Sequence, residues 1–186
     1  MDFIKVLALG ALVTGFTSSV NAGLLPNGVK GLVLGAPFEA VEAQAQQAWP
    51  QSTLRCSPHS FRSANLSCLV SAHPLADLTY GGVRLFTAFL YFKDQQLVGV
   101  LMYALPDDAS KVHRAVIDNI KPSMPRAPDV EKLTSAGGRI GWRSQTQVFL
   151  STYVTGETAG VTYSTTEFFA EHMKQLAADS KKSRDM

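Results

Sequence analysis

Residues 83–104 constrain the fold more than any other part of the sequence, because they predict a β-hairpin whose first strand is apolar on both faces. β-Branched and aromatic residues dominate Val83–Lys93, the polar Asp94–Gln96 suits a turn, and Leu97–Ala104 is apolar again. The predicted alternation puts on one face Leu85, Thr87, Phe89 and Tyr91, and on the other Arg84, Phe86, Ala88, Leu90 and Phe92. One face should pack against helices, and the other must be covered or used for binding.

Three segments have helical periodicity and are candidates for the layer that covers this hairpin. The first follows Pro37 and ends at Pro50, the second is capped by Asp107 or Asp108, and the third follows a Ser164–Glu167 capping box. Their apolar stripes are, in turn, Phe38, Val41, Ala45, Ala48 and Trp49; Ala109, Val112, Val116 and Ile120; and Phe169, Met173 and Leu176. We expect the helices to pack through these stripes.

The remaining short apolar segments predict further antiparallel strands. They lie at residues 52–56, 66–71, 139–143, 146–154 and 161–165. The predicted class is therefore α+β, an antiparallel sheet packed by about three helices in one domain over residues 23–179. A second hairpin near residue 146 follows prolines at 122, 125 and 128, which suggests two tandem half-units, 30–121 and 129–179. Residues 180–186 are expected to form a disordered tail.

The first 22 residues are typical of a secretory signal peptide. Lys5 precedes an apolar run over residues 6–16, and Val20-Asn21-Ala22 has small residues where signal peptidase cleaves. The alternative is a retained anchor helix, but the run is shorter than the ~20 residues that span a bilayer. We expect cleavage near Ala22, no membrane anchoring afterwards, and a periplasmic or secreted location.

The two cysteines agree with export. Cys56 and Cys68 bracket a polar segment, and an even pair in an oxidising compartment predicts a disulfide. Closing a loop of this size stabilises the fold by about 3 kcal/mol in the chain-entropy model. The alternative is two buried free thiols, which is typical of cytosolic proteins.

Charge and motifs exclude several function classes. Hydrophobic residues make up 46% of the chain and charged residues 17%, which predicts an ordered globular core. The net charge of +2 comes without a basic cluster, so we expect no nucleic-acid partner. The histidines 59, 73, 113 and 172 lack metal-ligand spacing, and no nucleophile elbow or phosphate loop is present. We therefore expect no metal, no cofactor and no local catalytic motif.

Aromatic and arginine side chains on the predicted strands and in the disulfide loop favour a protein partner, because such residues anchor interfaces. The candidate partner-binding residues are Phe61, Arg62, Arg84, Phe86, Tyr91, Trp142 and Tyr153. The alternative for each is a place in a two-layer core. Two other functions stay open: a small exported hydrolase with a non-local site around His73, Asp77 or His113, and a carrier of a small apolar ligand.

The order of these features resembles a known architecture. A short helix at Gly35–Val41 precedes the strands, Cys56 and Cys68 span the first of them, and Leu85–Val100 forms the hairpin. This pattern is similar to the β-lactamase-inhibitor-protein architecture, which small outer-membrane assembly lipoproteins share, although the lipoproteins' anchoring cysteine is absent here. The resemblance implies tandem α/β units whose antiparallel sheet grips another protein. It implies no role for an individual residue.

Overall fold

The computed structural model describes residues 28–72, 78–120, 131–135, 139–152 and 159–184. In chain order the elements are α1 (Phe38–Ala48), β1 (Ser52–Pro58), β2 (Leu66–Ala72), β3 (Thr79–Tyr80), β4 (Val83–Arg84), β5 (Thr87–Lys93), β6 (Gln96–Ala104), α2 (Pro106–Ile120), β7 (Glu131–Ser135), β8 (Arg139–Arg143), β9 (Gln147–Thr152), β10 (Ala159–Thr165) and α3 (Thr166–Arg184). The predicted α+β class is confirmed. The predicted signal peptide lies outside the described residues.

Most of the strands form one antiparallel sheet, which contains strands from the N-terminal and the C-terminal parts of the chain. Eight strands follow the order β1-β2-β5-β6-β10-β9-β8-β7, and β3 pairs with β4 separately. Each half of the large sheet consists of four strands that follow a helix in the chain, α1 before β1 and α2 before β7. The halves meet where β6 pairs with β10.

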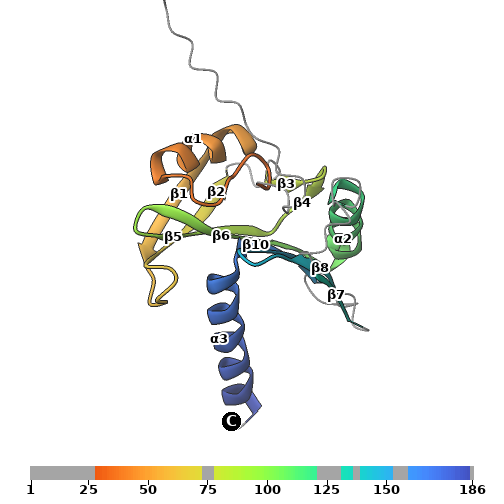
Figure 1. Cartoon of the computed structure of the whole chain (residues 1–186). Helices are drawn as coiled ribbons and strands as arrows, with labels where there is room; N and C mark the ends of the chain where they lie inside the picture. The colour runs from red at the N-terminus through yellow and green to blue at the C-terminus, as the bar shows by residue number, and fades with distance from the viewer. Residues whose placement is uncertain (1–27, 73–77, 121–130, 136–138, 153–158, 185–186) are drawn as a thin grey trace, which may run out of the picture.

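The helices lie on both faces of the sheet. Helices α1 and α2 lie on one face and α3 on the other, as Figure 1 shows. The main core fills the space between the sheet and the first two helices; its largest fully buried side chains include Trp49, Leu90, Phe92, Phe149 and Tyr163. Burying such large apolar side chains is the main favourable term in folding. We call this side the core face and the opposite side the α3 face.

The predicted alternation of the hairpin holds within β5 and fails just before it. Ala88, Leu90 and Phe92 are buried on the core face, and the intervening residues face α3. However, Leu85 is buried in the core and Phe86 is 61% exposed. Continuous alternation would have placed Phe86 on the core face and Leu85 on the α3 face. The two residues lie between strands β4 and β5, where Leu85 N–H donates to Leu78 O and Phe86 N–H donates to Tyr103 O. This irregular step turns Phe86 out of the core.

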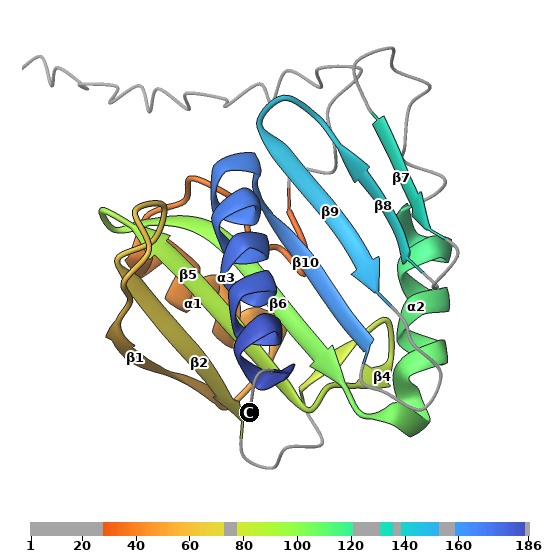
Figure 2. The ribbon, with the colours of Figure 1, turned by 90° about the horizontal axis from the view of Figure 1, so that it is seen from below.

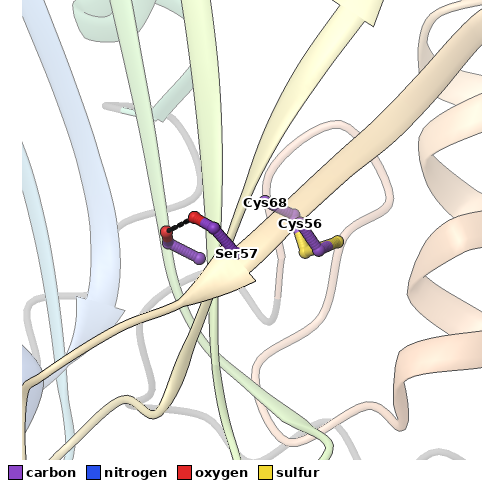
Figure 3. The surroundings of a disulfide bond; sticks show 4 residues. Cys56, Ser57 and Cys68 are labelled. Carbon is purple, nitrogen blue, oxygen red and sulfur yellow. Dashed lines mark hydrogen bonds between the residues drawn. A yellow bond between two sulfur atoms is a disulfide. The ribbon is translucent and has the colours of Figure 1, made fainter.

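The predicted disulfide is present and joins directly opposed residues of the β1–β2 hairpin. Cys56 and Cys68 are partners in the register, with Cα atoms 4.0 Å apart. Figure 3 shows the disulfide on one side of the hairpin and Ser57 on the other. The hydroxyl oxygens of Ser57 and Ser67 are 3.4 Å apart. The cross-link therefore lies on the core face, and the α3 face of this hairpin carries Arg55 and Leu69 beside small polar side chains.

Helix α3 differs from the prediction at both ends. Phe168 N–H donates to Thr165 Oγ1 at 3.3 Å, so Thr165 caps the helix, and Ser164, the predicted cap, is buried in β10. The helix continues to Arg184, so the predicted disorder is wrong for residues 180–184. Residues 174–182 are all exposed, and Gln175 donates to Asp179 one turn on, a pairing that supports a helix in solvent.

Candidate functional site

Helix α3 divides the α3 face into two sides. Seen from below in Figure 2, the helix crosses β6 and β10, with β5, β2 and β1 on one side and β9, β8 and β7 on the other. We call these the β5 side and the β9 side. Helix α3 contacts β6, β9 and β10, and Phe168 in its first turn is fully buried. Much of the α3 face therefore has no helix over it.

The β5 side holds an exposed apolar patch. Phe86 is 61% exposed, Leu105 45% and Leu69 36%. Phe89 and Tyr103 lie beside them, half-buried, with their rings edge-to-face at 6.5 Å. We call Leu69, Phe86, Phe89, Tyr103 and Leu105 the aromatic patch. The backbone places these residues together, because Leu69 pairs with Phe89 and the Phe86 N–H donates to Tyr103 O.

The surroundings of the aromatic patch are polar and positively charged. Arg55 pairs with Leu69 across β1 and β2, and Lys93 follows on the same face of β5. Arg84 is exposed two residues before Phe86. The other positions of β1, β2 and β5 on this face are Thr53, Ser57, Ser67, Ser71, Thr87, Phe89 and Tyr91. None of these strand positions carries an acidic residue, and Lys93, at the end of β5, lies 3.9 Å from the carboxylate of Asp94 in the following turn.

A second cluster holds the β1–β2 loop on the N-terminal half of α3. Glu171 accepts hydrogen bonds from Arg62 N–H and Ser63 N–H, both at 3.0 Å, and from Ser63 Oγ–H at 2.6 Å. The hydroxyl bond of Ser63 is the largest of the causes that lower the pKa of Glu171 to about 2, followed by the two backbone bonds. The loop therefore hydrogen-bonds to an ionised carboxylate on α3.

Aromatic rings fill the space between this loop and the helix. The ring centroids of Tyr91 and Phe168 are 4.7 Å apart, those of His59 and Phe61 are 4.3 Å apart, and Phe168 stacks on His172 at 5.7 Å. Burial lowers the pKa of both histidines. The charge of His59 lowers that of His172 further, and Glu171 acts in the opposite sense on His59. Both imidazoles are therefore mainly neutral at pH 7.

The β9 side contains a groove between α3 and the sheet, with a volume of about 220 Å³. The sheet contributes Tyr103, which the groove shares with the aromatic patch, together with Arg139, Leu150, Thr152, Gly160 and Thr162. The helix contributes Phe169, His172, Met173 and Leu176. Three of these helix residues are the predicted apolar stripe, which lines this groove while the adjacent Phe168 makes the buried contact with the sheet. Among the described residues that line the groove none is acidic, and Arg139 is the one strongly basic side chain.

The predicted partner-binding residues fall into three groups. Phe86 is exposed in the aromatic patch, and Arg84 is exposed on β4, a strand that contacts α2. Phe61, Arg62 and Tyr91 lie at the cluster beside α3, where Arg62 is exposed and the two rings are half-buried.

Trp142 is only 7% exposed and packs in the main core, so its side chain cannot serve as a surface anchor. Tyr153 lies outside the described residues. Sequence reasoning missed Leu69, Tyr103 and Leu105. Their exposure depends on where α3 crosses the sheet.

For the hydrolase alternative, the structure shows one close histidine–serine contact, but the serine is buried. His113 Nδ1 lies 2.9 Å from Ser151 Oγ, a pairing that nucleophilic catalysis uses. However, Ser151 is fully buried on the core face, so a substrate cannot reach its hydroxyl. His73 and Asp77 lie outside the described residues. Across the described ranges, no three His, Cys, Asp or Glu side chains are close enough to hold a metal ion.

A search of the described helices finds none that is long and apolar enough to cross a membrane. Comparison of the chain with protein-family models, with curated proteins and with solved structures finds no match. The function must therefore be argued from the surface itself.

Proposed function

We propose that this chain is an exported, non-enzymatic binding protein that grips another protein through the β5 side of its α3 face. The aromatic patch carries the proposal, above all Phe86 at 61% exposure with Leu69 and Tyr103 beside it. A contiguous exposed patch of large apolar side chains favours association with a partner. Aromatic residues with a polar, charged rim are the usual composition of protein interfaces.

The charges around the aromatic patch indicate the character of the partner. Arg55 pairs with Leu69 of the patch, and Lys93 lies on the same face at the end of β5, 3.9 Å from the carboxylate of Asp94. An acidic partner surface with an apolar centre would complement this arrangement. Rim charges mainly steer the encounter, whereas the apolar centre sets the dissociation rate.

The proposed location is the periplasm or the exterior, after cleavage of a signal peptide near Ala22. The Cys56–Cys68 disulfide supports this part of the proposal, because such bonds persist in oxidising compartments. Intact mass of the exported protein tests it directly. A mature chain that begins near Gly23 is expected, and full-length protein retained in the membrane would contradict it.

The test of the binding function compares two matched exposed apolar residues. Phe86 lies in the aromatic patch, and Leu176, at 48% exposure, lies on α3 at the β9 side. Tagged wild-type protein, Phe86→Ala and Leu176→Ala are each used to capture partners from the envelope fraction, and the captured proteins are quantified by mass spectrometry.

We expect one acidic protein to be captured by wild type and Leu176→Ala, and at least tenfold less by Phe86→Ala. The melting temperature of Phe86→Ala should stay within a few degrees, because the side chain is mostly outside the core. Equal capture by all three chains, or no specific capture by wild type, would contradict the proposed function.

A further inference from the structure

The groove on the β9 side has a chemical character distinct from that of the aromatic patch. Its walls are apolar, with Leu150 from the sheet and Phe169, Met173 and Leu176 from the helix. Its polar groups are the hydroxyls of Thr152, Thr162 and Tyr103 and the guanidinium of Arg139. A concave apolar site with a few polar groups that fix orientation is the usual form of a small-molecule site.

The charges that line the groove determine which ligand charge it favours. Arg139 pairs with Thr152 in the register of β8 and β9, so its charge lies beside the threonine end of the groove. Burial lowers the pKa of His172 and raises that of Tyr103, so both are neutral at pH 7. Among the described side chains Arg139 makes no ion pair, and no carboxylate lines the groove. The described lining of the groove therefore carries one net positive charge next to an apolar wall.

The volume and the backbone limit what can enter. The volume of about 220 Å³ lies below the roughly 300–1,000 Å³ of sites for drug-sized ligands, so the groove suits a small ligand. The floor strands β9 and β10 are interior strands, so their backbone groups are already paired. A peptide laid on this floor would leave its own amide groups without partners, which is costly in an apolar site. An acyl chain has no such groups.

We propose that this groove binds a small amphiphilic monocarboxylate, of the size of a medium-chain fatty acid. The acyl chain lies between α3 and β9–β10, against Leu150, Phe169 and Met173. The carboxylate pairs with Arg139 near the Thr152 hydroxyl. An Arg–carboxylate pair is charge-assisted and frequently bidentate, which fixes the orientation of the ligand.

The experiment uses the purified mature chain, so it does not depend on the unidentified protein partner. Octanoate, 1-octanol and a tripeptide with an apolar C-terminal residue and a free carboxylate are titrated in turn, below their aggregation concentrations. The [¹³C]methyl signal of Met173 in NMR spectra reports occupancy of the groove. The variants are Arg139→Gln and, as a matched control on the other side of α3, Arg55→Gln, since both arginines are exposed on the same face.

We expect octanoate to bind with saturable shifts of the Met173 methyl and at least tenfold more tightly than 1-octanol. Arg139→Gln should abolish that preference, while Arg55→Gln keeps it. Equal affinity for octanoate and octanol, an unchanged preference in Arg139→Gln, or tighter binding of the tripeptide would each overturn the proposal. Because the aromatic patch is untouched by Arg139→Gln, capture of a protein partner should persist in this variant whichever result is obtained here.

Discussion

The attachment of α3 to the sheet depends on a contact that one methyl group would disrupt. Phe168 is fully buried, and its ring lies against Gly99 of β6. A Cβ atom added at Gly99 would lie 2.9 Å from two ring atoms of Phe168, closer than real Cβ contacts. Tyr91 pairs with Gly99 and has its ring centroid 4.7 Å from that of Phe168, so it limits movement of the ring to that side. Gly99→Ala must therefore displace the Phe168 ring or the helix that carries it.

The cost can be worked out from the contacts. Overpacking a tight site costs about 1–3 kcal/mol. Replacing glycine by alanine otherwise stabilises by about 0.4–1 kcal/mol through the unfolded chain, so we expect Gly99→Ala to lose roughly 1–2 kcal/mol. Phe168→Ala removes a fully buried ring and should cost about 3–5 kcal/mol by itself. In the double variant the clash is gone, and Gly99→Ala becomes neutral or slightly stabilising there.

The assay is a double-mutant cycle by urea denaturation, followed by circular dichroism and tryptophan fluorescence. The expected coupling energy between the two sites is roughly 1–3 kcal/mol, in the sense that the double variant is more stable than the sum of the single variants predicts. Additive effects of Gly99→Ala and Phe168→Ala would refute the reasoning, because they would mean that the helix does not rest on this glycine.

Two further predictions concern the β1–β2 hairpin. Reducing the Cys56–Cys68 bond, which spans a sequence separation of 12, should cost about 3 kcal/mol and lower the melting temperature by ~6–12 °C. The melting temperature of Cys56→Ala/Cys68→Ala should equal that of the reduced wild type and should not change when reductant is added. A variant whose melting temperature still responds to reductant would contradict this. Glu171 has a pKa lowered from 4.5 to about 2, so its contribution to stability is present above pH ~4.5 and is lost as the pH falls towards ~2. Glu171→Gln should lack that component of the acid-induced fall in melting temperature; parallel pH profiles for variant and wild type would argue against the hydrogen bonds to Ser63.

Local patterns explain which parts of the fold could be predicted from the sequence. The alternation within β5 and the apolar stripe of α1 follow from residues close in the chain, and both predictions are confirmed. Strand β7 was missed because Glu131–Ser135 has a single apolar residue and forms only as an edge partner of β8. The Phe86 surface depends on the irregular step at Leu85, which is fixed by Leu78 rather than by its neighbours.

The candidate sites were harder to predict than the fold, because they arise where α3 meets a sheet assembled from the whole chain. The stripe of Phe169, Met173 and Leu176 predicts a packed helix face, yet in the structure it lines an open groove. The turn of the chain from β10 into α3 places Phe168 against β6. No local sequence pattern distinguishes Phe168 from Phe169. Trp142 shows the reverse error, since an aromatic residue on a strand gives no sign of which face it occupies.

The position of the disulfide at the border of the sheet has a consequence for self-association. Strand β1 is an edge of the eight-stranded sheet, and an edge strand can leave its neighbour and pair with a second molecule. Because Cys56 is bonded to Cys68, β1 cannot exchange between molecules unless β2 leaves with it and breaks its pairing with β5. The oxidised protein is thereby protected against exchange of β1 between molecules, and a chain that escapes oxidation loses that protection.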